Sequence, residues 1–255
     1  MRDVEQALAR AYGTDAGANH TPRPSSAIPP GPHFAVESAI PTQSTDAVVL
    51  SWPETVRALE RAHGDSFEAL AAAMIAGRDE RGSKVVLFTS CHRGEGRTTL
   101  ILTLARALAR RPDRTLIIDG DLGGPMLARS LGLRPLVGLD DVIEHEKSLA
   151  DALIEAPDDH LTVLALRLAV ARPREFLASP HWARSMAKVR REFDFVLIDG
   201  GPLFTGLSAA AIPGGADAAV LVHHKSRTSE RSLKRARNLL EHEGLPLMGL
   251  AETFC

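Results

Sequence analysis

The feature that most constrains the fold of this chain is an alternation of short apolar runs with amphipathic stretches, which continues from about residue 47 to the end. The runs are rich in Val, Ile and Leu, which is typical of strands that are buried on both faces. Strands and helices in alternation predict an α/β fold with a doubly wound, mostly parallel sheet covered by helices on both faces. The expected strands are Lys84–Thr89, Arg114–Asp119, Leu161–Leu166, Phe195–Asp199, Ala218–His223 and Leu247–Thr253.

The stretches between these strands have the spacing of helices. A helix with a break near Gly64 is expected before the first of them, and a short edge strand is expected over Ala47–Leu50. Pro112 and Gly244 follow two of the helical stretches and are typical of helix ends. The expected helices are Pro53–Arg78, Thr98–Arg110, Arg174–Arg191 and Ser229–His242.

A glycine-containing segment, Cys91–Thr99, joins the expected strand Lys84–Thr89 to a helix. It resembles the phosphate-binding pattern G-x-x-x-x-G-K-[ST], with Arg97 at the lysine position and Cys91 at the first glycine. Gly94 and Gly96 allow the backbone N–H groups to turn toward phosphate oxygens, and the helix start favours an anion. The sequence therefore predicts a P-loop NTPase. The expected nucleotide-binding residues are His92, Arg93, Gly94, Glu95, Gly96, Arg97, Thr98 and Thr99.

Carboxylates follow two of the expected strands. Asp119 and Asp121 end one strand and Asp199 ends another, at the sheet edge where ligands bind in open α/β folds. A magnesium nucleotide needs acidic groups there, to hold the metal and its water shell. The sequence predicts ATP or ADP with Mg²⁺ as ligands. The expected metal-binding residues are Thr98, Asp119 and Asp199, and the expected catalytic residues are Arg97, Asp119, Asp121 and Asp199.

Three segments carry a resemblance to a known family. Thr89–Thr99, Leu116–Pro125 and Phe193–Pro202 resemble the three Walker motifs of the bacterial tyrosine kinases, and Val137–Ile143 and Arg172–Ser179 resemble their connecting segments. These kinases are ATP-binding cytoplasmic domains that control capsule and exopolysaccharide synthesis. The resemblance spans about Ser66 to Ala251. It implies a phosphotransferase that works beside a membrane-anchored polysaccharide-export or chain-length adaptor protein, at the inner face of the membrane, and it leaves a homo-oligomer open.

The chain also departs from the family. Arginine at position 97 puts fast phosphoryl transfer in doubt, since its planar fork follows a moving phosphate less well than lysine. Ala71 and Met74 replace arginines of an oligomer-forming pattern that begins at Glu68. The only tyrosine is Tyr12, so self-phosphorylation on a C-terminal tyrosine cluster is not expected. Weakened kinase-like activity is therefore predicted.

Two other functions stay open. One is a positioning or partitioning ATPase of the deviant-Walker group, in which Arg93 would substitute for a lysine that reaches the partner's nucleotide. The other is a non-catalytic nucleotide sensor. The net charge of −2 gives no general attraction to nucleic acid, which is not expected as a partner.

The first 46 residues differ in composition from the rest. Five prolines lie between Tyr12 and Pro41, and such a segment is predicted to be flexible, with a short helix before it over Met1–Ala11. Residues 47–255 are expected to form the nucleotide-binding domain. The two cysteines have neither disulfide nor metal spacing and suit a reducing cytoplasm, with a redox-sensitive Cys91 as a less favoured option.

Overall fold

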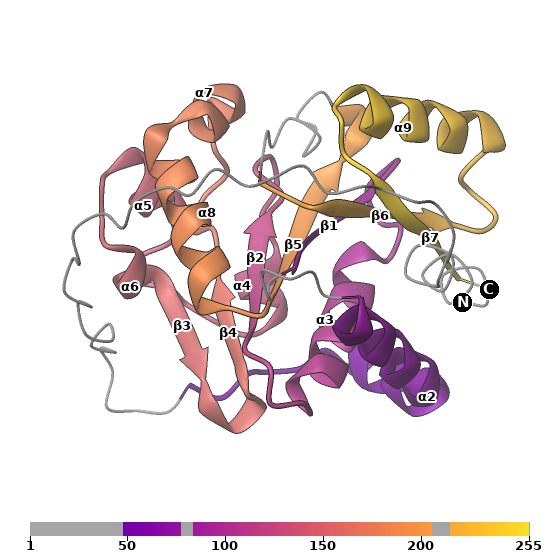
Figure 1. The fold of residues 1–255 in the computed structure, drawn as a ribbon, viewed down its shortest axis with the longest axis horizontal. Coiled ribbons are helices and arrows are strands. Elements are labelled where there is room, and N and C mark those ends of the chain that lie inside the picture. Colours follow the sequence, from indigo (N-terminus) through magenta and orange to yellow (C-terminus); the bar gives the residue numbers. More distant parts are fainter. Residues whose placement is uncertain (1–47, 78–83, 206–214, 255) are drawn as a thin grey trace, which may run out of the picture.

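A computed structural model describes residues 48–77, 84–205 and 215–254. The described strands form one sheet in the order β3-β4-β2-β5-β1-β6-β7, parallel except for the edge pair β3–β4 (Figure 1). The predicted α/β sheet is thus confirmed. The strands are β1 (Lys84–Ser90), β2 (Thr115–Gly120), β3 (Leu153–Ala156), β4 (Leu161–Leu164), β5 (Phe195–Pro202), β6 (Ala218–His224) and β7 (Leu247–Thr253).

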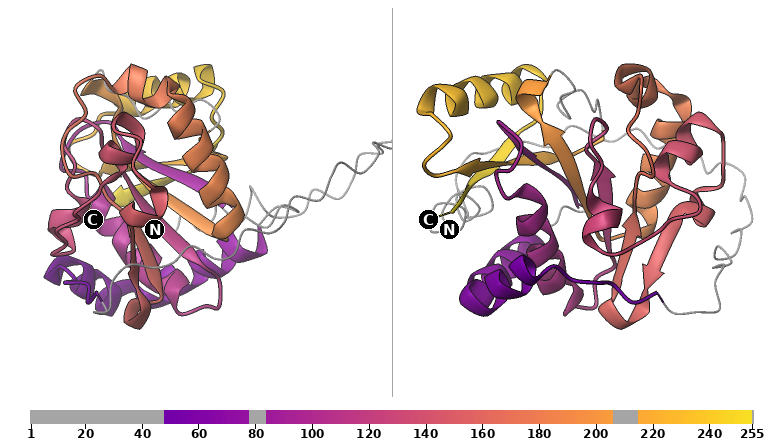
Figure 2. Two further views of the ribbon diagram at one scale, coloured as in Figure 1. Left: turned by 90° about the vertical axis from the view of Figure 1, so that its left-hand side faces the viewer. Right: turned by 180° about the vertical axis from the view of Figure 1, so that it is seen from behind.

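Helices cover both faces of the sheet, as Figure 1 and the turned views in Figure 2 show. Two long helices, α2 (Glu54–Ala76) and α3 (Arg97–Ala109), pack on one face, where α4 (Leu127–Ser130) also buries its apolar side. The other face carries α5 (Leu139–Glu144), α6 (Leu149–Ala152), α7 (Pro173–Ala178), α8 (Pro180–Glu192) and α9 (Glu230–His242). Single turns of 3₁₀ helix lie at Pro157–Asp159 and Leu203–Thr205.

Successive side chains of each strand point to opposite faces of the sheet, so the core is divided into two layers. In β1, Val86 and Phe88 contribute to the layer beneath α2 and α3, while Val85 and Leu87 contribute to the opposite layer. All of these side chains are almost fully buried. Burial on both faces explains why the strands have continuous apolar sequences.

The register places the predicted carboxylates side by side. Strand β2 pairs in parallel with β5, with Asp119 opposite Asp199. Strand β5 also pairs with β1, which leads directly into the segment Cys91–Thr99. The carboxyl ends of β1, β2 and β5 therefore meet at one edge of the sheet.

Several predicted boundaries change in the structure. The helix expected over Arg174–Arg191 is two helices, because Pro180 cannot continue α7 and the Ser179 side chain caps α8 instead. The edge strand expected before α2 is wrong, because Val48–Leu50 has no strand structure, while the edge strand β3 was not anticipated. The break expected near Gly64 is confirmed by a non-helical His63 within α2.

Helix α2 is fixed to α3 by apolar contacts and by ion pairs. Glu68 pairs with Arg110 and Arg111 of the α3 end at 2.7 and 2.9 Å, while Ala71 and Met74 are buried in the core. This face of α2 therefore packs within the chain. The predicted flexible segment, residues 1–46, lies outside the described residues, so the proposed domain boundary stays a prediction.

Candidate nucleotide-binding site

The loop between β1 and α3 has the backbone shape that its glycines allow. Gly94 and Gly96 have φ values of +76° and +81°, a region that favours glycine. A side chain at Gly96 would also crowd Thr253, whose Cγ2 lies 3.2 Å from where a Cβ would be. Helix α3 begins at the next residue, so its first N–H groups face outward without an intrahelical acceptor. Such a helix start attracts anions such as phosphate.

Two contacts from distant parts of the chain hold this loop in place, one from the turn between β6 and α9 and one from β7. The carboxylate of Glu95 is buried, accepts a hydrogen bond from the His92 N–H at 2.9 Å and also accepts one from the Thr228 hydroxyl. The Thr253 hydroxyl donates to the Glu95 carbonyl at 2.8 Å. The Glu95 side chain thus braces the loop from inside. Sequence reasoning missed Thr228 and Thr253, because a lone threonine carries no signal of such a contact.

Arg97 points into the protein. Its Nε donates to Asp199 Oδ1 at 2.8 Å, one terminal nitrogen donates to Ser90 Oγ at 2.8 Å, and the other lies 3.3 Å from Asp121 Oδ2. Its side chain is only 10% exposed. The arginine at the loop-lysine position is therefore held against two strand-end carboxylates.

Thr98, the next residue, also contacts the β5 carboxylate. Its hydroxyl donates to Asp199 Oδ2 at 2.6 Å, so both oxygens of Asp199 are occupied by neighbours in α3. Arg93, at the tip of the loop, donates to both oxygens of Asp121 at 3.0 and 3.3 Å and is half exposed. The predicted loop residues and strand-end aspartates are thus brought together; their roles remain predictions.

Asp119 differs from the other two aspartates because no arginine within the described ranges contacts it. Burial, reinforced by the nearby negative charge of Asp199, raises its pKa to about 7. Backbone N–H groups of Leu127 and Asp121, at 3.0 and 3.3 Å, act in the opposite direction but do not offset burial. Near neutral pH this carboxyl is therefore divided between its charged and neutral forms.

The aspartates do not form a ready-made magnesium site. Mg²⁺ prefers oxygen ligands, which Thr98 and the carboxylates have. However, every carboxylate oxygen of Asp119, Asp121 and Asp199 already accepts a hydrogen bond from the protein. Within residues 48–77, 84–205 and 215–254, no three His, Cys, Asp or Glu side chains are grouped so that they could hold a metal ion. These residues do not fit a resident Mg²⁺ ion, which would arrive bound to nucleotide phosphates instead.

Cys91 is not the reactive thiol that a helix start and nearby arginines would favour. It is fully buried, and burial together with the charge of Glu95 raises its pKa to about 12. The thiol stays protonated at physiological pH. Its small side chain fits the tight start of the loop.

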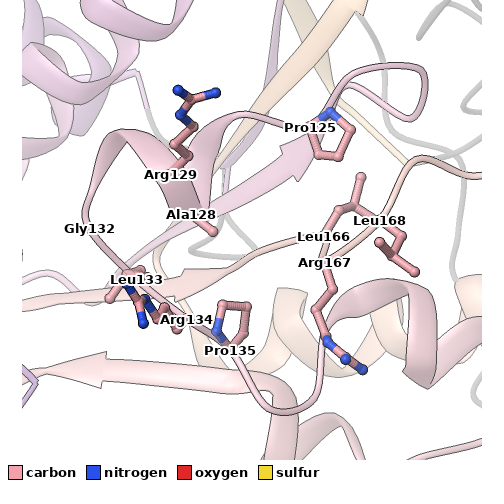
Figure 3. A pocket seen from close by; sticks show the side chains of 10 residues that line it. All are labelled: Pro125, Ala128, Arg129, Gly132, Leu133, Arg134, Pro135, Leu166, Arg167 and Leu168. Carbon is pink, nitrogen blue, oxygen red and sulfur yellow. The ribbon is translucent and has the colours of Figure 1, made fainter.

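A hollow lies at the same edge of the sheet, beyond the ends of β2 and β4. Pro125 lies on its wall, and the preceding Gly124 packs against the Arg93 guanidinium, which connects the hollow to the loop. Its volume is about 520 Å³. Figure 3 shows apolar side chains around it and arginines spread along its rim. We call this hollow the groove; it is lined by Pro125, Ala128, Arg129, Gly132, Leu133, Arg134, Pro135, Leu166, Arg167 and Leu168.

Comparison with known proteins places the chain in a family. The chain is 30% identical over 162 residues to the tyrosine-protein kinase YwqD of Bacillus subtilis, a match that covers 63% of this chain and 68% of YwqD. The chain belongs to the bacterial tyrosine kinase family. The tyrosine-protein kinase CpsD of Streptococcus pneumoniae is 28% identical over 168 residues, 66% of this chain and 74% of CpsD. No family model matches the chain.

Solved structures show the same fold as this kinase-family chain. The chimerical protein CapA2B2 superposes with a TM-score of 0.70 at 22% identity, over 80% of this chain and 91% of that one. The septum site-determining protein MinD of Pyrococcus horikoshii, complexed with Mg-ADP, superposes with a TM-score of 0.56 at 23% identity, over 66% and 69%. The predicted P-loop NTPase fold is therefore confirmed. In the part of the chain that the structure describes, no helix is long and apolar enough to cross a membrane.

Proposed function

We propose that this chain binds ATP or ADP at the loop Cys91–Thr99 and acts as a kinase-like regulator of exopolysaccharide biosynthesis. The observation that carries the proposal is the convergence of the glycine-shaped loop, the start of α3 and the Thr98–Asp199 contact at one sheet edge. Backbone N–H groups and the helix start would hold the phosphates. Membership of the tyrosine kinase family supports ATP as the phosphoryl donor.

The position of Arg97 indicates slow phosphoryl transfer. In most phosphate loops a mobile lysine follows the charge that develops on the transferred phosphoryl group. Here the guanidinium is fixed by Asp199 and Ser90 and is largely withdrawn from the loop surface. Losing a contact that matters mainly in the transition state lowers turnover more than affinity. We therefore expect binding to persist and turnover to be low or dependent on a partner.

Calorimetric titration of the pure protein with ATP and with ADP tests nucleotide binding. The double variant Thr98→Ala/Asp119→Ala should lose binding, because it removes a loop hydroxyl and the buried carboxyl that holds the backbone N–H groups of Asp121 and Leu127. Circular dichroism must show that the variant is folded. Asp158→Ala, at an exposed carboxylate near the start of β4, is the control and should bind like the parent. If the double variant binds as tightly as the parent, the site is wrongly placed.

The partner that we propose is a membrane-anchored polysaccharide-export or chain-length adaptor protein, which would bring the chain to the inner face of the membrane. Family membership supports this choice. Co-purification with such a protein encoded beside this gene tests it, and turnover should rise on its addition. Nucleotide binding with no turnover, both with and without the partner, would instead favour a non-catalytic nucleotide sensor.

The similarity to MinD keeps a positioning ATPase as a second candidate, although that similarity shows only the fold. In the described structure Arg93, which would have to reach a partner's nucleotide, is bound to Asp121 of its own chain. Nucleotide-dependent dimerisation, measured by light scattering with ATP and with ADP, would favour this candidate.

A further inference from the structure

We propose that Arg97 is the chain's own counter-cation for Asp199 and Asp121, so that nucleotide affinity at this loop does not depend on Mg²⁺. The inference rests on the proposed function, because it concerns the same loop. It goes further by assigning to Arg97, assisted by Arg93, the charge neutralisation that a divalent cation would otherwise supply.

The first step is the geometry of Arg97. Its guanidinium lies between two carboxylates from different strands, at 2.8 Å from Asp199 Oδ1 and 3.3 Å from Asp121 Oδ2. The side chains of Asp199 and Asp121 are 3% and 8% exposed, and buried carboxylates of this kind need a partner of opposite charge. A guanidinium keeps its charge at every physiological pH. The pairing is therefore permanent as long as the fold persists.

The second step is a count of charge. Arg97 and Arg93 bring two positive charges to Asp121 and Asp199, which bring two negative charges. The charges of Asp121 and Asp199 are thus balanced, and the remaining strand-end carboxyl, Asp119, is only partly charged near neutral pH because burial raises its pKa to about 7. The hydrogen bonds agree with this count, because the carboxylate oxygens of both residues are all acceptors from Arg93, Arg97 or Thr98.

The third step concerns the nucleotide. Phosphates placed at the start of α3 would be repelled by bare carboxylates at the ends of β2 and β5, and a divalent cation normally removes that repulsion. Here Arg93 and Arg97 already remove the repulsion from Asp121 and Asp199. The Arg97 guanidinium is withdrawn from the loop surface, so its contribution is the neutralisation of the carboxylates rather than a direct contact with a phosphate. Arg93, which is half exposed, offers N–H donors.

Lysine could not replace Arg97 in this arrangement. Its single ammonium group is a compact charge and lacks the planar fork that contacts Ser90, Asp121 and Asp199 together. With lysine at this position, one carboxylate would lose its close partner. Nucleotide affinity should then depend on a metal ion to neutralise it.

The first experiment compares the ATP affinity of the parent and of Arg97→Lys by calorimetry, with Mg²⁺ or with EDTA at matched ionic strength. The parent should bind within about threefold under the two conditions, while Arg97→Lys should weaken by about tenfold or more when Mg²⁺ is removed. Arg134→Lys, in the groove, is the matched control and should behave like the parent. If the ATP affinity of the parent falls by about tenfold or more in EDTA, the inference is overturned and the proposed function is left intact.

The second experiment uses a metal ion alone and does not need nucleotide. Binding of Mn²⁺, as a probe for Mg²⁺, is followed by electron paramagnetic resonance for the parent, Arg97→Met and Arg97→Met/Asp199→Asn. The parent should leave Mn²⁺ free, Arg97→Met should gain a site, and the double variant should lose it again. If Arg97→Met does not fold, Arg97→Lys replaces it in the same measurement.

The two experiments separate the possible failures. If no protein binds nucleotide but Arg97→Met gains Mn²⁺, the proposed function fails while the counter-cation role of Arg97 stands. If the parent itself binds Mn²⁺ as tightly as Arg97→Met, the counter-cation role is overturned whatever the nucleotide result.

Discussion

Two groups of arginines lie along the same edge of the sheet, and their surroundings differ. Arg93 and Arg97, in the phosphate loop, are bound to Asp121 and Asp199. Arg129 and Arg134, on the rim of the groove, are exposed, and neither forms an ion pair with another residue that the structure describes.

This difference shows that the position of an arginine at a ligand-binding edge does not decide its role. The role of the arginine is decided by the carboxylates that lie next to it. In the loop, the guanidinium groups neutralise buried acids and become part of the fold. On the groove rim, the guanidinium groups of Arg129 and Arg134 are exposed and contribute little to stability, whereas Arg167 pairs with Asp141 at 2.8 Å.

Removal of the Arg97 charge should have the largest effect on stability. Arg97→Met leaves the buried Asp199 and Asp121 with less compensation and should lower the free energy of unfolding by about 3–5 kcal/mol. Urea unfolding at neutral pH measures it. The matched substitution in the groove, Arg134→Met, should change the free energy by no more than about 0.5 kcal/mol. Equal effects of the two substitutions would show that the loop and the groove do not differ in this way.

Asp119 sharpens the comparison, because it is the strand-end carboxylate that no described arginine contacts. Its pKa rises from an ordinary value of 3.8 to about 7 on folding. Between these values the folded protein holds a proton that the unfolded chain has lost, so this residue makes stability fall as pH rises, by about 1.4 kcal/mol per pH unit. Urea unfolding of the parent should show this slope between about pH 5 and 6 and lose it above about pH 7, and Asp119→Asn should lack it throughout. Identical slopes would contradict the assignment.

Arg97→Lys tests whether the fixed guanidinium limits chemistry. With Mg²⁺ present, turnover should rise by about tenfold with little change in nucleotide affinity, because lysine can follow the transferred phosphoryl group. Steady-state release of phosphate and calorimetry measure the two quantities. If the parent turns over rapidly and Arg97→Lys is slower, Arg97 takes part in catalysis and the hypothesis of weakened activity is wrong.

Charge reversal in the groove should have the smallest effect. Arg129→Glu and Arg134→Glu should leave stability within about 0.5 kcal/mol of the parent, since both side chains are exposed. ATP affinity should change by no more than about twofold at physiological salt, which screens exposed charges. A large loss of affinity in either variant would place the nucleotide closer to the groove than we propose.

The sequence by itself determined the order of the parallel strands and the composition of the site, although it missed the edge strand β3. Buried parallel strands need continuous apolar runs, and parallel strands bring their carboxyl ends to one edge, so the strand pattern alone placed Asp119 and Asp199 together. The loop was likewise predictable, because Gly94 and Gly96 allow positive φ values that other residues adopt rarely. Sequence reasoning failed at Pro180, where one predicted helix is two.

Only the tertiary structure decided where the side chains of the site point. Arg97 fits the loop pattern as a phosphate ligand, yet it turns toward Asp121 and Asp199, which are 24 and 102 positions away in the sequence. Nearby arginines favour a reactive Cys91, but its burial makes it inert. Side-chain direction and pKa depend on burial and on charges supplied by distant strands, and the order of residues along the chain does not contain that information.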